Sequence, residues 1–251
     1  MIYGILLCAV ASLATGLGGL VVLCTRCVNC KTLAISQGFA AGVMIGISLL
    51  DMLPKSFAFA KSGTGTVMAV VVVAALFGIG CVAAVVLEKI TCAEQKDKNE
   101  TGFAVKKSCL VTMIVIVLHN LPEGMLTALT ALSDVLYGAQ ITFAVAMHNI
   151  PEGIAVASGV LYVTKSKTKA VLTAFLTGVA ELFGGVVALL LLQQFVTQSF
   201  IMAFIAVISG VMVQISVFEL VPGGIKIYSP KAVLKGFVAG VITIALGICA
   251  F

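Results

Sequence analysis

The chain has 251 residues, of which 61% are hydrophobic and 10% charged, and its mean hydropathy is +1.21. A soluble domain carries about a quarter charged residues, so these values exclude one and predict an all-α polytopic membrane protein. The net charge of +5 does not indicate a nucleic-acid partner, because the lysines fall in loops between apolar segments.

Eight apolar segments, each close to the roughly 20 residues that a bilayer requires, predict eight transmembrane helices. They cover residues 2–24, 33–53, 66–88, 108–132, 139–161, 169–192, 199–221 and 232–250. The first segment lacks a basic start and is too long for a signal peptide, so we interpret it as a span. Residues 1–251 are therefore expected to form a single transmembrane domain in the lipid bilayer, with one hydrophilic loop at 89–107.

Positive charges are shared unevenly among the predicted loops. Thirteen lysines and arginines follow the odd-numbered spans, whereas only Lys55 and Lys61 follow the even-numbered spans. Because cytoplasmic loops carry the excess of positive charge, this bias predicts that the 89–107 loop is cytosolic and that both termini lie outside. The expected location is the plasma membrane.

Both histidines of the chain lie in a repeated hexapeptide, HNLPEG at 119–124 and HNIPEG at 148–153. Residues four apart share one face of an α-helix, so the His and the Glu of each copy face the same way. Pro122 and Pro151 have no N–H to donate. They are predicted to kink or break their helices and to free a backbone carbonyl oxygen beside these side chains.

The carboxylates near span centres have no fixed counter-charge. Glu123, Glu152 and Glu181 lie there, while no lysine or arginine lies deep in any span. An ionised carboxylate in this position costs roughly 2.5–3.5 kcal/mol, so its counter-charge must be mobile, either a proton or a metal ion. Protonated glutamates that are hydrogen-bonded between helices are the alternative. That alternative does not explain why a histidine precedes two of them by one turn.

Imidazole, carboxamide and carboxylate groups together favour a borderline divalent metal such as Zn²⁺ or Fe²⁺. We predict a binuclear site in which two glutamates are shared by both ions. The candidate ligands are His119, Glu123, His148 and Glu152 for the first ion, and Asn120, Asn149 and Glu181 with the same two glutamates for the second.

A second repeat links the second and seventh spans. Residues 42–54 align without gaps on 210–222, with six of thirteen positions identical and Asp51 opposite Glu219. The paired spans are an odd number apart, so they cross the membrane in opposite senses. This predicts an inverted-topology repeat of helices 1–3 against helices 6–8, with helices 4 and 5 paired at the centre. Transporters of this build bind substrate near the midplane. Chance similarity of Gly- and Val-rich helices is the alternative.

Two acidic residues of the repeat keep more than one interpretation, and a third acidic residue has no acidic counterpart. Asp51 and Glu219 lie near span ends, where they are either relays at the two mouths or solvated helix-end charges. Glu181 aligns with Thr15, so this candidate ligand has no acidic counterpart.

The paired HNLPEG and HNIPEG motifs, with Glu181 in the next span, resemble the ZIP (Zrt/Irt-like) family of divalent metal transporters. The resemblance implies uptake of Zn²⁺, and often of Fe²⁺, Mn²⁺, Co²⁺ or Cd²⁺, toward the cytosol through a binuclear centre between helices four, five and six. It also implies alternating access, in which one helix group slides against another, and a homodimer. It adds Met44 as a further candidate ligand.

Two features depart from the pattern of that family. The 89–107 loop contains no histidine, and Phe218 precedes Glu219 where some members have a histidine, so a histidine-dependent cytosolic sensor is not expected. Three cysteines at the cytosolic end of the first span have a spacing that could hold Zn²⁺ or accept palmitate, and ordinary free thiols are the alternative. These are Cys24, Cys27 and Cys30.

A channel and an intramembrane metalloenzyme are the alternative functions. An enzyme needs an open metal position and a separate base, and a metalloprotease usually shows HExxH, whereas the fourth residue after each histidine here is Glu. We therefore expect no enzymatic activity. The predicted repeat favours alternating access over a fixed pore, while channel-like conduction stays open.

Overall fold

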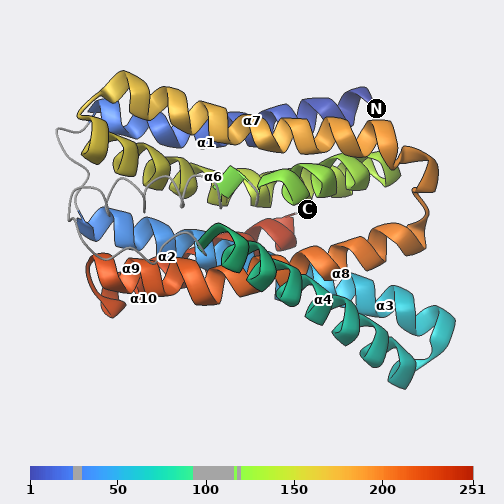
Figure 1. Ribbon diagram of the computed structural model, residues 1–251. Coiled ribbons are helices and arrows are strands. Elements are labelled where there is room, and N and C mark those ends of the chain that lie inside the picture. Colours follow the sequence, from blue (N-terminus) through green and yellow to red (C-terminus); the bar gives the residue numbers. More distant parts are fainter. Residues whose placement is uncertain (25–29, 93–115, 118–119, 251) are drawn as a thin grey trace.

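The computed structural model describes residues 1–24, 30–92, 116–117 and 120–250, and within these ranges it contains helices and no strand. The all-α prediction is confirmed. The helices lie in two layers that run roughly side by side (Figure 1).

The first layer, which we call the hexapeptide group, contains the described residues of both hexapeptides. Its helices are α1 (Ile2–Cys24), α6 (Val135–Thr164), α7 (Lys167–Leu191) and the helical residues 120–133. Glycine allows these helices to approach closely. A Cβ on Gly18 would overlap the carbonyl oxygen of Ile150, and one on Gly153 would overlap that of Thr15. α1 therefore packs directly against the second hexapeptide.

The second layer, which we call the support group, contains α2 (Cys30–Ile47), α3 (Leu53–Thr64), α4 (Thr66–Cys92), α8 (Gln198–Ile215), α9 (Val221–Ile227) and α10 (Pro230–Ala250). Within it, α2 packs against α10 and α4 packs against α8. The two groups meet where α2 contacts α6, in a core that includes Met44, Ile47 and Val145. A 3₁₀ turn at Gln193–Phe195 lies in the connection from α7 to α8, at the end of the bundle where the N-terminus lies (Figure 1).

Two five-residue π-helical turns interrupt the support group, at Ser48–Met52 and Ser216–Leu220. Each is followed by a helix with proline in its first turn, Pro54 in α3 and Pro222 in α9. A proline ring clashes with the carbonyl four residues earlier, and a π turn widens the backbone there. The wider hydrogen bond runs from the Leu53 N–H to the carbonyl oxygen of Ser48.

Two helices run on beyond the predicted spans, and one proline does not break its helix. The predicted spans 33–53 and 199–221 stop before Pro54 and Pro222, whereas helical segments run from Cys30 to Thr64 and from Gln198 to Ile227. Pro151 was expected to kink or break its helix, and the break is wrong, because this proline lies inside a continuous α6. A proline removes one backbone hydrogen bond, and packing against neighbouring helices can hold a membrane helix together despite that loss.

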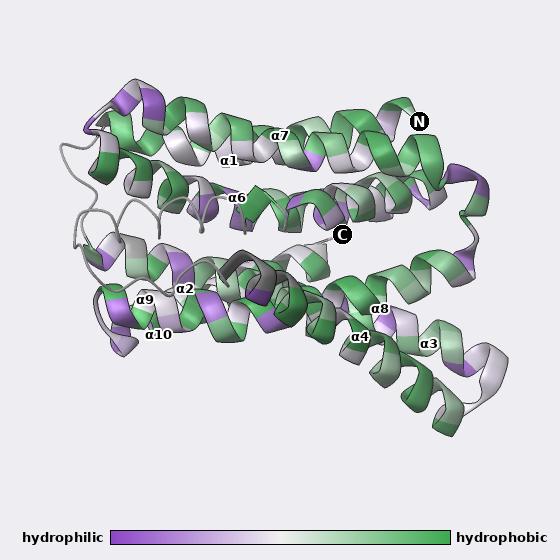
Figure 2. Cartoon of the chain, in the orientation of Figure 1, coloured by the Kyte–Doolittle hydropathy of each residue, from purple (hydrophilic) through white to green (hydrophobic). Residues whose placement is uncertain are grey.

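Six helical segments of the described part are long and apolar enough to cross a membrane. They are Ile2–Leu23, Cys30–Thr64, Thr66–Val86, Lys167–Leu191, Gln198–Ile227 and Pro230–Cys249. Figure 2 shows α4 coloured as hydrophobic along most of its length. Apolar side chains of this helix lie on the outside of the bundle, and Val67, for example, is 80% exposed. Such a surface is suited to lipid rather than to water. The protein is therefore an integral membrane protein.

Some predicted features lie outside the described residues. α6 covers the fifth predicted span, whereas the fourth span, 108–132, is described only in part. The predicted 89–107 loop is described only as far as Cys92, where α4 ends, and Cys27 is outside the described residues.

Candidate metal centre

The second hexapeptide lies in the middle of α6, where the His148 side chain is fully buried. Its Nδ1 atom is 3.1 Å from the carbonyl oxygen of Ala144, and its Nε2 atom is 3.1 Å from both carboxylate oxygens of Glu123. A carbonyl oxygen can only accept a hydrogen bond, so Nδ1 carries the hydrogen and donates it. In the neutral ring, Nε2 then directs a lone pair toward the carboxylate of Glu123.

Two acceptor groups repel each other at this distance unless a cation lies between them. That cation can be a proton on Nε2 or a metal ion. Two ligands of one tetrahedral Zn²⁺, each about 2.0–2.2 Å from the metal, are separated by roughly 3.3–3.6 Å. His148 and Glu123 are therefore close to the separation of two ligands on a single ion. The bond to Ala144 holds the ring in the tautomer that a metal requires.

The two asparagines that follow the histidines anchor the hexapeptides to neighbouring helices. The Asn120 Nδ2 atom donates to the carbonyl oxygen of Thr177, at 3.2 Å. The Asn149 Nδ2 atom donates to the carbonyl oxygen of Ala11, at 3.1 Å, and to Glu181 Oε2, at 2.7 Å. Both amide carbonyl oxygens are buried and have no hydrogen-bond partner among the described residues. They are thus available as neutral oxygen ligands.

The glycines that end the hexapeptides make a matching pair of contacts. A Cβ on Gly124 would overlap the carbonyl oxygen of Glu181 in α7, and one on Gly153 would overlap that of Thr15 in α1. Sequence comparison had aligned Glu181 with Thr15, and each of these two residues packs against the glycine of one hexapeptide. Only Glu181 brings a carboxylate to the site.

The three central glutamates are all buried, with Glu181 fully so and Glu152 3% exposed. Both Glu123 and Glu152 lie within electrostatic range of Glu181. Among the described residues, no three His, Cys, Asp or Glu side chains come close enough together to hold a metal ion. His119, a predicted ligand, is outside the described residues. The described part therefore brings the candidates together as the pairs His148–Glu123 and Asn149–Glu181.

Met44 is buried in α2, on the support-group side of the interface. Its sulfur accepts a hydrogen bond from Ser216 Oγ at 3.6 Å. It packs in the same core cluster as Ala144 and Val145 of α6, one turn before His148. Met44 thus lies near the second hexapeptide, while its described polar contact is to its own group.

The two acidic residues near the span ends differ in their surroundings. Asp51 lies in the first π turn, is 8% exposed, and accepts an ion pair from Lys55 at 2.8 Å. It is therefore a buried, paired group rather than a solvated helix-end charge. Glu219 lies in the second π turn and is half-buried.

Thr15 is a polar residue of this region to which sequence reasoning gave no role. It is fully buried, and its hydroxyl has no partner among the described residues. A helical threonine usually donates to the carbonyl four residues back, as Thr142 does to Gly138 at 2.7 Å. For Thr15 that carbonyl belongs to Ala11 and already accepts from Asn149. Its alignment with Glu181 was the signal that pointed to this position.

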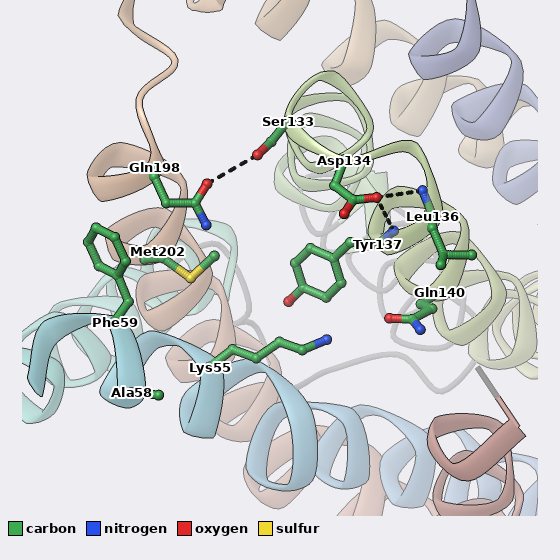
Figure 3. A pocket seen from close by; sticks show the side chains of 10 residues that line it. All are labelled: Lys55, Ala58, Phe59, Ser133, Asp134, Leu136, Tyr137, Gln140, Gln198 and Met202. Carbon is green, nitrogen blue, oxygen red and sulfur yellow. Dashed lines mark hydrogen bonds between the residues drawn. The ribbon is translucent and has the colours of Figure 1, made fainter. Parts of the chain in front are cut away.

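A cavity of about 560 Å³ opens between the two groups, at the end where residues 133–134 connect to α6. Figure 3 shows Lys55 reaching across it from α3 toward Tyr137 and Gln140 of α6. A smaller cavity of about 240 Å³ is lined by Asp51 and Ile47, and shares Lys55 and Gln140 with the first. The two cavities therefore meet at Lys55.

Comparisons with known proteins identify the family of the chain. The family model described as ZIP Zinc transporter matches residues 89–251. The chain is 32% identical to the zinc transporter ZupT of Chlorobium chlorochromatii, over 96% of this chain and 94% of that protein. It is 34% identical to ZupT of Corynebacterium glutamicum over the whole of both chains, and 37% identical to ZupT of Escherichia coli over 87% and 85%. These relatives are named as transporters and not as enzymes. The chain belongs to the ZIP zinc transporter family.

Proposed function

We propose that this protein carries divalent transition metal ions, Zn²⁺ first, across its membrane toward the cytosol. The observation that carries the proposal is the buried pair formed by the His148 Nε2 atom and the Glu123 carboxylate, 3.1 Å apart. No Lys or Arg is buried in the described part to balance the central glutamates. A metal ion would supply that positive charge during each transport cycle. Fe²⁺, Mn²⁺, Co²⁺ and Cd²⁺ suit the same ligand types less specifically.

We assign the substrate to a binuclear site, with Glu123 and Glu152 shared by two ions. The unpartnered amide oxygens of Asn120 and Asn149 support a second position beside the first. The first ion would be held by His119, Glu123, His148 and Glu152, and the second by Asn120, Asn149, Glu181 and the two shared glutamates, with Met44 a further candidate.

Alternating access would move the hexapeptide group against the support group. The two π turns at equivalent positions of the 42–54 and 210–222 repeat support an inverted repeat, as do the matched glycine contacts. Such repeats commonly underlie alternating access. We place both termini outside, in the plasma membrane, with residues 1–251 as a single domain and the working unit a homodimer.

Uptake into liposomes tests the proposal directly. Purified protein is reconstituted around a fluorescent Zn²⁺ indicator, and initial rates are measured for Zn²⁺, Fe²⁺, Mn²⁺ and Cd²⁺. Glu123→Gln removes the charge but keeps the shape, so the Zn²⁺ rate should fall by roughly 100-fold or more. Glu100→Gln makes the same change in the hydrophilic loop and should transport normally. Wild-type rates in Glu123→Gln would contradict the assignment.

A second measurement separates a carrier from a channel. Single cysteines near Asp51 and near Glu219, in a background without native cysteines, are treated with impermeant thiol reagents with and without Zn²⁺. Alternating access predicts that the two positions become accessible in opposite conditions. Simultaneous access from both sides would instead favour channel-like conduction.

A further inference from the structure

Lys55 makes two contacts that join the helix groups at the cavity. Its Nζ atom is 2.8 Å from Asp51 Oδ1, one helical turn earlier in the support group. The same atom lies 3.9 Å from the centre of the Tyr137 ring, which belongs to α6 of the hexapeptide group. Figure 3 shows the lysine side chain extended toward this ring. The ammonium is thus held between a carboxylate of one group and an aromatic face of the other.

The position of Lys55 divides the larger cavity from the smaller one. The larger cavity is lined by polar groups that include Ser133, Asp134 and Gln198. The smaller one is lined by Ile47, which is buried, and by Phe143, which is 37% exposed. Ile47 is one turn from Met44 in α2, on the side of the support group that faces α6. A cation that passes from the larger cavity to the smaller one therefore meets the Lys55 ammonium, which lines both.

The Asp51 carboxylate and the Tyr137 ring, which both contact Lys55, form a cation-binding site that we call the seat. A carboxylate attracts any cation, and the face of an aromatic ring adds a favourable interaction with positive charge. The second carboxylate oxygen of Asp51 is buried and has no hydrogen-bond partner among the described residues. Lys55 contacts only Oδ1, and the Tyr137 side chain lies close to the same carboxylate, so Oδ2 is a second oxygen that an entering ion could reach beside Tyr137.

We propose that the Lys55 ammonium competes with entering cations for this seat. This competition makes entry selective for divalent over monovalent cations. The inference rests on the proposed transport of divalent metal. A monovalent ion that replaces the ammonium exchanges one positive charge for another and gains no Coulomb energy, whereas a divalent ion at the same distance has twice the attraction to Asp51 that the ammonium had. The flexible lysine stem lets the displaced ammonium swing into the larger cavity, where Asp134 and water can receive it.

The test compares Lys55→Met with Lys61→Met, which removes the same charge from the exposed last turn of the same helix. Initial Zn²⁺ uptake is measured across Zn²⁺ concentrations, with and without 150 mM Na⁺. Removing the competitor should lower the KM of Lys55→Met about threefold to tenfold, the scale of one exposed ion pair or cation–π contact. It should also let Na⁺ raise that KM again. Lys61→Met should show the small Na⁺ effect of the wild type.

Variants of Tyr137 test the aromatic side of the seat. Tyr137→Leu weakens the hold on the Lys55 ammonium, so Na⁺ should raise the KM of this variant as it does in Lys55→Met, and the double variant should be no more sensitive to Na⁺ than the more sensitive single variant. Tyr137→Phe keeps the ring and should restore the resistance to Na⁺ that Tyr137→Leu loses. A purely structural contact would change the melting temperature without changing the Na⁺ dependence.

The outcomes separate this inference from the proposed function. Wild-type protein that takes up no divalent metal would overturn the proposed function. Normal wild-type uptake with equal KM and equal Na⁺ dependence in Lys55→Met and Lys61→Met would overturn the role of Lys55 alone.

Discussion

The two helix groups differ in how their buried polar atoms are satisfied, although Gln37 and Asp51 of the support group also have an oxygen without a partner among the described residues. In the support group, buried serine hydroxyls donate to backbone carbonyls within 3 Å: Ser56 to Met202, Ser209 to Ile205, and Ser216 to Met212. In the hexapeptide group, several buried oxygens have no partner among the described residues: Thr15 Oγ1, Asn120 Oδ1, Asn149 Oδ1 and Glu181 Oε1. The first pattern stabilises a rigid frame, and the second leaves acceptors available.

That difference favours the hexapeptide group as the place where a cation binds. Each buried polar atom without a partner costs about 1–3 kcal/mol, so a fold does not gather several of them by chance. A bound divalent ion or ordered water would remove the cost. These unpartnered oxygens lie on four helices, α1, residues 120–133, α6 and α7, which supports the proposal that the hexapeptide group binds the metal ion.

The largest effect is expected from the shared carboxylates. Glu152→Ala should abolish Zn²⁺ uptake in liposomes, because it removes a ligand from both proposed ions. Ser209→Ala, which removes a buried polar group of the support group, should lower stability slightly and leave uptake close to normal. Wild-type uptake by Glu152→Ala would contradict the proposal that the hexapeptide group, and not the support group, binds the metal ion.

A smaller loss is expected where a hexapeptide touches α7. Gly124→Ala places a Cβ onto the carbonyl oxygen of Glu181, so the helices must separate, at a cost on the order of 1–3 kcal/mol. Uptake should fall about tenfold, with a lower melting temperature in detergent. Gly78→Ala is the matched control, because nothing lies within 4 Å of a Cβ there. Equal behaviour of the two variants would contradict the packing described.

The pH dependence of metal binding tests whether the imidazole and carboxylate groups of the hexapeptide group are the metal ligands. Imidazole and carboxylate ligands must be free of protons to bind metal, so lowering the pH from 8 to 5 should weaken Zn²⁺ binding by about tenfold or more. Isothermal titration calorimetry measures this, and Glu123→Gln should flatten the slope. A flat profile in the wild type would mean that these groups are not the ligands.

The smallest effect is expected from Thr15. Thr15→Val removes the hydroxyl at nearly constant volume and should weaken Zn²⁺ binding about threefold, the scale of one hydrogen bond. Thr15→Ser should restore it. Thr142→Val removes a hydroxyl that is satisfied within its own helix and should leave binding unchanged. Equal Zn²⁺ affinities in Thr15→Val and Thr142→Val would show that the Thr15 hydroxyl takes no part in Zn²⁺ binding.

Composition and the apolar segments were enough to predict the helical class, and the paired hexapeptides were enough to predict the family. The structure places His148 and Glu123, two candidate ligands of one ion, next to each other, and their role as ligands stays a prediction. The predicted spans stop at residues 53 and 221, whereas the helices run on through Pro54 and Pro222, because a single sequence shows the missing N–H but not the π turn that accommodates it.

Long-range contacts were harder to predict. The approach of Lys55 to Tyr137 joins residues 82 positions apart in the sequence, and no local pattern indicates it. Likewise, the Thr15 hydroxyl has no partner among the described residues, while the Ala11 carbonyl oxygen that it would normally use accepts a hydrogen bond from Asn149. Both depend on how whole helices are placed, which spacing along one helix does not determine.

The π turn at Ser48–Met52 determines how far α3 is rotated about the helix axis relative to α2. It accommodates one residue more than an α-helical turn, and one residue corresponds to about 100° of rotation about the helix axis. Ser56 reaches the carbonyl of Met202, and Lys55 reaches the Tyr137 ring, with this offset in place. If the turn became regular α-helix with no residue removed, both side chains would rotate by about 100° away from these partners, whereas deleting Leu50 as well would return them close to their present direction. The π turn therefore determines how α3, which carries Lys55, is rotated relative to α2, which carries Met44.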